Sequence, residues 1–246
     1  MSEVTDITVH RPAGPKPTKD TKQNGIVTAY LVAYNVSQML GWTVMMIIMV
    51  SHIFKTHSYL LLYEDVERIL QICQTAAILE IVHSMTGLVR SNWILTAFQV
   101  YSRVFLIWGI IWSVPSTQNG LPVALWLFAW TITEIIRYTF YFFSLLPGPV
   151  PSFLVWCRYT FFIILYPIGV TGELMSIFAA IPVVRDSKMY SFELPNKWNF
   201  AFNYYYYLCF IVISYVPVFP QLYIHMFNQR NKVLAGAFDR HRQKAE

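Results

Sequence analysis

The chain has 246 residues, of which 56% are hydrophobic and only 13% are charged. A soluble domain carries about 25% charged residues, so this composition leaves too little polar surface to cover a globule in water. The net charge of +5 is modest, and in such a chain it fits contact with anionic lipid headgroups better than binding of a nucleic acid. We therefore expect a protein that crosses a membrane several times.

Taken in chain order, residues 1–24 are polar and contain several prolines, which predicts a disordered, solvated arm. Residues 25–51 contain no charged side chain and exceed the roughly 20 apolar residues that a transmembrane helix needs. A charged segment, residues 52–68, is predicted to be a loop. Five further apolar spans are predicted over residues 69–89, 93–114, 122–146, 152–181 and 199–227, followed by a basic tail over residues 228–246. The expected fold is all-α, with a six-helix membrane domain over residues 25–227.

Six spans place both chain termini on the same side of the membrane. The arm and the tail together carry more Lys and Arg than the loops on the opposite side. Positive residues favour the cytoplasmic side, so both termini are expected in the cytosol.

Seven ionisable side chains fall inside the predicted spans: Glu80, His83, Arg103, Glu134, Arg137, Arg158 and Glu173. A charge at the bilayer centre costs about 2.5–3.5 kcal/mol, so such groups persist when they pair or line a wet cavity. Three acids and three arginines balance, which predicts a shared polar interior among the second to fifth spans. Arg103 is expected to pair with Glu80 or Glu134.

Arg137 and Arg158 lie near the proposed cytosolic ends of the fourth and fifth spans. They either extend to lipid headgroups or form a cationic mouth for an anionic ligand. Glu80 and His83 share one helix face at a spacing that also occurs in di-iron bundles. Such sites need a second copy of that pair and two more carboxylates, so neither a metal nor another cofactor is expected.

The strongest candidate for chemistry is Glu173, deep in the fifth span. Tyr166 lies seven residues earlier on the same helical face, about 10.5 Å away along a straight axis. Pro167 predicts a kink, and Gly169 and Gly172 would let another helix or a flexible chain approach. An acid and a phenol in low dielectric form a possible acid/base pair. Alternatively, Tyr166 is only an aromatic side chain that packs between helices, and the proline and glycines only produce a kink that helps the helices pack.

These residues carry a resemblance to a known family. Residues 158–173, RYTFFIILYPIGVTGE, resemble the very-long-chain 3-hydroxyacyl-CoA dehydratases, also called the protein-tyrosine-phosphatase-like A family. Residues 79–83, 102–105, 130–141 and 202–206 fit the same family, and the resemblance extends over residues 30–234. The long ordered match over the fourth and fifth spans is specific, whereas no single short motif here would be.

The resemblance implies a hydro-lyase that converts a 3-hydroxyacyl-CoA to a trans-2-enoyl-CoA, the third step of microsomal fatty-acid elongation. It implies six spans, cytosolic termini and an endoplasmic reticulum membrane. It implies as partners the condensing enzyme, the 3-ketoacyl-CoA reductase and the enoyl-CoA reductase. The catalytic pair maps onto Tyr166 and Glu173, with the choice of base left open. The CoA phosphates are expected near Arg137, Arg158 and Arg90.

Three other functions are alternatives to the dehydratase activity. A non-catalytic scaffold of the same fold is the main alternative. A transporter fits the intramembrane charges, but the chain has no internal repeat. Residues 83–91 echo a phosphatase loop, but Ser84 occupies the position of the cysteine whose thiolate that chemistry needs, so phosphatase activity is not expected.

Overall fold

The computed structural model describes residues 25–245, and their side chains as far as residue 233, so the predicted arm over residues 1–24 lies outside it. The described part is helical and contains no β-strand, only an isolated bridge between Phe192 and Phe202. The predicted all-α class is therefore confirmed. The elements are α1 (Gly25–Thr56), α2 (Leu62–Ala76), α3 (Ile78–Met85), α4 (Trp93–Phe105), the π-helix η1 (Leu106–Ile111), the 3-10 turn η2 (Pro115–Thr117), α5 (Leu121–Leu145), α6 (Ser152–Thr160), α7 (Phe162–Ser187) and α8 (Tyr204–Ala245).

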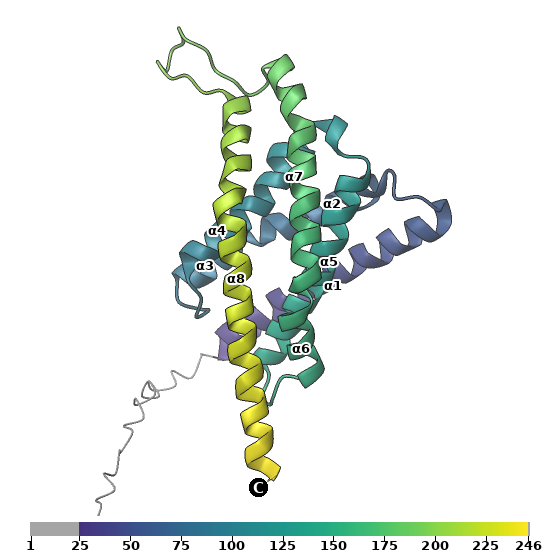
Figure 1. Cartoon of the computed structure of the whole chain (residues 1–246), viewed down its shortest axis with the longest axis vertical. Helices are drawn as coiled ribbons and strands as arrows, with labels where there is room; N and C mark the ends of the chain where they lie inside the picture. The colour runs from purple at the N-terminus through teal and green to yellow at the C-terminus, as the bar shows by residue number, and fades with distance from the viewer. Residues whose placement is uncertain (1–24, 246) are drawn as a thin grey trace, which may run out of the picture.

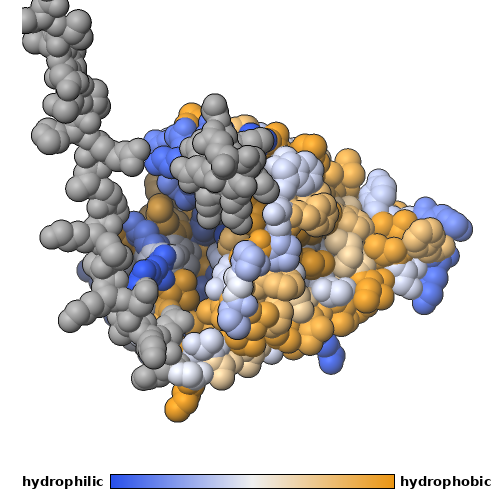
Figure 2. Space-filling view, turned by 90° about the horizontal axis from the view of Figure 1, so that it is seen from below, coloured by the Kyte–Doolittle hydropathy of each residue, from blue (hydrophilic) through white to orange (hydrophobic). Residues whose placement is uncertain are grey.

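Among the residues that the structure describes, four helical segments are long and apolar enough to cross a membrane: Gly25–Thr56, Trp93–Ile111, Phe162–Ser187 and Tyr204–Val233. The predicted second span is divided at Ala77 into α2 and α3, each too short to cross alone. The predicted fourth span, α5, is 25 residues long and packs chiefly against α1 and α7 (Figure 1). Seen from below, apolar residues cover much of the surface, as expected for a protein surrounded by lipid (Figure 2).

Several predicted boundaries were wrong, each for a local reason. The predicted loop over residues 52–68 is largely helical, because α1 continues to Thr56 and α2 begins at Leu62. Helix α2 is amphipathic: its acidic residues Glu64 and Asp65 are exposed, whereas Leu62, Val66 and Leu70 are buried. Helix α8 does not stop at residue 227 but continues to residue 245, so the predicted basic tail is mostly helical.

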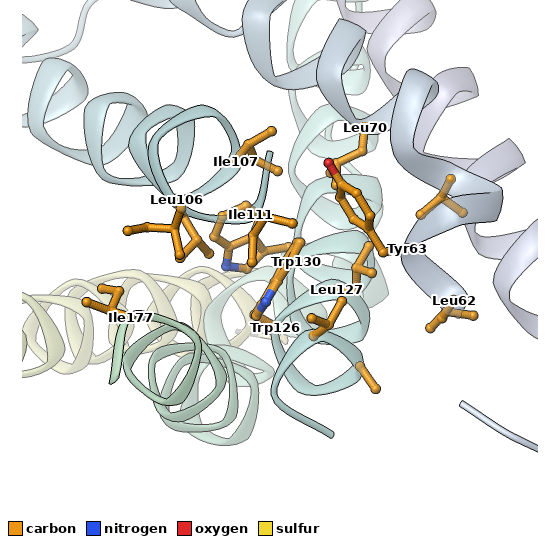
Figure 3. Close-up of a cluster of buried hydrophobic side chains, with 14 of the residues drawn as sticks. Leu62, Tyr63, Leu70, Leu106, Ile107, Ile111, Trp126, Leu127, Trp130 and Ile177 are labelled. Carbon is orange, nitrogen blue, oxygen red and sulfur yellow. The ribbon is translucent and has the colours of Figure 1, made fainter. Parts of the chain in front are cut away.

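The core forms where α2, η1, α5 and α7 meet. Ile107, Trp126, Leu127 and Ile177 converge there from three elements, and Tyr63 joins them from α2 (Figure 3). All five side chains are almost fully buried. Dense packing of this kind fixes α5 in the middle of the bundle, and α5 in turn positions the polar residues described below.

Gly172 brings the backbones of α5 and α7 together. A Cβ atom on Gly172 would lie 2.6 Å from the carbonyl oxygen of Pro122 and 2.8 Å from the amide nitrogen of Trp126. A Cβ on Gly169 would lie 3.5 Å from the side chain of Ala129, which is an ordinary contact. The predicted close approach of another helix at these glycines is therefore confirmed.

Gly172→Ala is expected to destabilise the protein by about 1–3 kcal/mol, because the added methyl group meets backbone atoms that cannot rotate away. Thermal unfolding of the purified protein in detergent measures the effect. Gly169→Ala is the matched control on the same helix, and its unfolding temperature should stay near that of the parent. Equal losses in the two variants would contradict the tight contact at Gly172.

Helix α7 runs through Pro167 without a break, and the interruption in this region lies at Phe161, between α6 and α7. Proline has no amide hydrogen, so the carbonyl of Ile163 loses its helical donor. The hydroxyl of Tyr223 on α8 donates to that carbonyl oxygen at 2.9 Å. At the position where the sequence predicts a kink, a side chain from the neighbouring helix thus replaces the hydrogen bond that Pro167 cannot make.

Candidate active site

The carboxylate of Glu173 is the centre of the candidate site. Glu173 is buried in α7, with 7% of its surface exposed. Its Oε1 accepts a hydrogen bond from Nε1 of Trp130 on α5, and its Oε2 accepts one from the hydroxyl of Tyr215 on α8, each at 2.8 Å. Both oxygens are therefore satisfied by neighbouring helices, as a buried carboxylate requires.

Tyr166 lies against α8 at the same helix–helix interface. Its ring is half-buried and stacks nearly parallel on the rings of Phe219 and Tyr223, with centroids 5.0 Å and 5.9 Å away. No hydrogen bond joins Tyr166 to Glu173 within the described side chains, because the carboxylate oxygens meet Trp130 and Tyr215 instead. The structure thus brings the predicted pair to one interface without a direct link.

One face of α8 covers both candidate residues. Tyr215, Phe219 and Tyr223 are spaced four residues apart and so lie along one side of the helix. Tyr215 contacts Glu173, and the other two contact Tyr166, because α7 and α8 run antiparallel (Figure 1). Access to the pair from this side therefore requires α8 to shift.

A buried ion-pair network lies beside this site. Arg137 on α5 binds both oxygens of Glu80 on α3, at 2.7 Å and 2.9 Å, and pairs with Glu134 at 2.6 Å. Arg103 on α4 forms an ion pair with Glu134. The hydroxyl of Tyr138 donates to Glu80 as well. Two acids and two arginines thus neutralise each other among α3, α4 and α5.

This network confirms the predicted polar interior and corrects part of it. Of the two acids predicted as partners of Arg103, the structure shows Glu134. Arg137 has a side chain only 14% exposed and is engaged by two carboxylates, so it neither reaches headgroups nor offers a free cationic mouth. Glu173 takes part in no ion pair within residues 25–233.

The other two arginines proposed from the sequence as site residues, Arg158 and Arg90, differ in their surroundings. Nη2 of Arg158 lies 3.2 Å from the hydroxyl of Tyr141, and its guanidinium lies over the rings of Phe140 and Tyr141. Arg158 has no acidic partner in the described part of the chain. Arg90 is exposed in the loop between α3 and α4. The structure leaves these two cations free to meet an anion.

Polar side chains follow one face of α5 from the neighbourhood of Glu173 to that of Arg158. Trp130 bonds Glu173, Glu134 and Arg137 belong to the ion-pair network, and Tyr141 bonds Arg158. The eleven helical steps from Trp130 to Tyr141 span about 16 Å of helix. A polar stripe on one helix therefore extends from the buried carboxylate of Glu173 to the guanidinium of Arg158.

Sequence reasoning missed the partners of the central carboxylate. In the sequence, Trp130 stands out only as the first residue of a segment that resembles the family, and Tyr215 lies in an apolar run without any local signal. Both act from other helices, 43 and 42 residues away from Glu173 in the chain. Helical periodicity shows which face a residue occupies but not what packs on that face.

Two surface clefts lie away from Glu173. One of about 380 Å³ is apolar and lies between α5, α6 and α7, where Ile132, Trp156 and Ile164 line it. The other, of about 220 Å³, is lined by Arg185, Lys188 and four further residues where α7 and α8 adjoin their connecting loop. Neither of these two clefts borders the carboxylate of Glu173.

Comparison with known proteins gives close relatives. Residues 74–236 match the family described as protein tyrosine phosphatase-like protein, PTPLA. The chain is 53% identical over 210 residues to very-long-chain (3R)-3-hydroxyacyl-CoA dehydratase 2 of Mus musculus, covering 85% of this chain and 82% of the relative. It is 52% identical to the Homo sapiens protein of that name, with the same coverage. It is 46% identical to very-long-chain (3R)-3-hydroxyacyl-CoA dehydratase hpo-8 of Caenorhabditis elegans, covering 85% of this chain and 96% of the relative. No solved structure gives a significant match.

Proposed function

The chain belongs to the protein tyrosine phosphatase-like protein family, PTPLA, and on that premise we propose that it dehydrates a very-long-chain (3R)-3-hydroxyacyl-CoA to the trans-2-enoyl-CoA. This reaction is the dehydration step of fatty-acid elongation. The observation that carries the proposal is a buried carboxylate, Glu173, on the same helix as the phenol of Tyr166, in a chain whose relatives are named as dehydratases. Such a buried carboxylate can take up and return a proton.

Dehydration removes a proton from the carbon next to the thioester and expels the β-hydroxyl group as water. Hydroxide is a poor leaving group, so the hydroxyl needs a proton donor. We assign Glu173 as the base that takes the α-proton and Tyr166 as the partner that hydrogen-bonds the departing hydroxyl. The stacking of Tyr166 on Phe219 supports this assignment, because it holds the phenol at the α7–α8 interface, where Tyr215 also contacts Glu173.

We further propose six spans with both termini in the cytosol. Two contacts support alternating helix directions. The amide of Leu61, after α1, bonds the side chain of Asn119, before α5. At the opposite ends of the same bundle, Tyr30 near the start of α1 lies 2.9 Å from His83 near the end of α3. Under this topology α5 crosses the membrane with its charges buried, and α2 and α3 form one interrupted span.

The proposed domain organisation is a membrane domain over residues 25–227, flanked by an arm over residues 1–24 and a basic C-terminal segment. The proposed location is the endoplasmic reticulum membrane. The proposed partners are the condensing enzyme, the 3-ketoacyl-CoA reductase and the enoyl-CoA reductase. Their substrates and products share the long acyl chain and the CoA group, so neighbouring enzymes would spare the intermediates from leaving the membrane.

Arg158 and Arg90 are proposed to bind the CoA phosphates at the cytosolic end of the domain. Arg158→Gln is expected to raise KM for the acyl-CoA about tenfold with kcat unchanged, because a charged hydrogen bond made equally in ground and transition states is lost. Arg185→Gln, which changes an exposed arginine at the other end of α7, is the matched control. An unchanged KM for Arg158→Gln would contradict this role.

The experiment that tests the function uses the purified full chain in nanodiscs with a long-chain (3R)-3-hydroxyacyl-CoA. Formation of the trans-2-enoyl-CoA, followed by chromatography of the thioesters, is the expected result. A folded protein that turns over no 3-hydroxyacyl-CoA of any chain length would instead support the non-catalytic scaffold.

A further inference from the structure

The two oxygens of Glu173 have chemically different partners. Oε1 faces the indole N–H of Trp130, which can donate a hydrogen bond but cannot accept one. Oε2 faces the hydroxyl of Tyr215, which can do either. A proton placed on Oε1 would compete with the indole N–H, whereas a proton on Oε2 would still find an acceptor. The oxygen that can change its protonation without losing a partner is therefore Oε2.

The electrostatic surroundings of Glu173 support such a change. Glu80 and Glu134 are each held by arginines, so protonating either would break a buried ion pair. Glu173 forms no ion pair within residues 25–233, and neutral dipoles alone hold its two oxygens. Among these three buried acids, Glu173 is the one that can become neutral without leaving a cation unpaired.

The bond from Tyr215 differs from the other buried tyrosine bonds of α8. Tyr204 donates to the backbone carbonyl of Gly109, and Tyr223 donates to that of Ile163. In both bonds the acceptor is a backbone carbonyl, which does not titrate. Tyr215 instead donates to a carboxylate that lies on the helix face of Tyr166.

We propose that Tyr215 is a positioning residue for the dehydration, which aims Oε2 of Glu173 at the substrate and stays hydrogen-bonded to it in both protonation states. This inference rests on the proposed function. The Cα–H bond of the substrate breaks, its proton forms an O–H bond with Oε2, and its electron pair passes to the thioester as an enolate. A carboxylate oxygen has two lone pairs, so Oε2 takes the proton beside Tyr215. The enolate then re-forms the thioester carbonyl and the Cβ–O bond breaks. The Tyr166 hydroxyl gives its proton to the departing β-hydroxyl, which leaves as water, and the proton held by Glu173 then restores the Tyr166 phenol as the enoyl product forms.

Tyr215→Phe tests this role, with Tyr204→Phe as the matched control. Each variant removes one interhelical hydroxyl of α8 and keeps the ring. Tyr215→Phe is expected to lower kcat about tenfold and to leave KM within about twofold, since the lost bond orients the reacting oxygen rather than the substrate. Tyr204→Phe is expected to keep the parent kcat. Thermal unfolding should show similar small losses for the two variants.

A second measurement does not depend on turnover. Infrared difference spectra between low and high pH contain carboxyl bands, and Glu173→Gln identifies the band of Glu173. Tyr215→Phe is expected to shift that band, because the oxygen has lost its hydroxyl partner, whereas Tyr204→Phe leaves it in place.

An unshifted band, or a parent-like kcat for Tyr215→Phe, would overturn the inference. Equal losses of kcat in both variants would also overturn it, since they would indicate a general packing role. Absence of turnover in the parent protein would reject the proposed function, and the infrared band would still test the contact.

Discussion

Glu173→Gln is expected to lower kcat for dehydration by about 10²–10⁴-fold, the usual contribution of general acid–base catalysis. Glutamine has the same shape and its amide oxygen can still accept from Trp130, but it cannot take up a proton. The fold should therefore persist while the chemistry is lost. Steady-state formation of the trans-2-enoyl-CoA by the purified variant measures the effect.

Two further variants make this test specific. Glu193→Gln removes an exposed acid that pairs with Lys188 and is expected to keep full activity. Tyr166→Phe keeps the ring that stacks on Phe219 and Tyr223 and removes only the hydroxyl, so its activity should fall as well. Parent-like turnover by both Glu173→Gln and Tyr166→Phe would show that the reaction occurs elsewhere.

Arg137→Met is expected to destabilise the protein by about 3–5 kcal/mol, because it leaves buried carboxylates without their cation. Glu80 loses both of its guanidinium bonds, and Glu134 keeps only Arg103. Thermal unfolding in detergent and the yield of folded protein measure the loss.

Two comparisons separate this effect from a general sensitivity to losing an arginine. Arg185→Met breaks an exposed pair with Asp186, and such a pair is worth at most about 1 kcal/mol. Adding Glu80→Gln to Arg137→Met should restore part of the lost stability, because one of the unpaired charges disappears. If the double variant were no more stable than Arg137→Met, the buried pair would not explain the loss.

The ion-pair network and the candidate site are connected through α5. Glu134 and Arg137 tie this helix to α3 and α4, and Trp130 lies one turn before Glu134 on the same helix. Holding α5 in place therefore also holds the indole N–H against Glu173. We expect mutations in the network to reduce activity through the position of Trp130 as well as through stability.

Much of the architecture could be predicted from the sequence because it depends on local properties. All six predicted apolar segments are helical in their greater part, since length and hydropathy alone favour helices in a bilayer. Tyr166 and Glu173 share one helix face because a spacing of seven residues closes two turns. Gly172 and Gly169 indicated a close helix contact because residues without bulky side chains permit one.

The tertiary structure alone decided which groups meet. The sequence placed Arg137 near a helix end, where lipid headgroups were plausible partners, but its partner Glu80 lies 57 residues away in the chain. In the same way, the sequence shows that Glu173 is an acid within an apolar helix. It does not show that Trp130 donates a hydrogen bond to one oxygen of Glu173 and Tyr215 donates one to the other. Periodicity specifies the face of each helix, whereas hydrogen bonds between helices depend on how those faces pack, and packing is a property of the whole bundle.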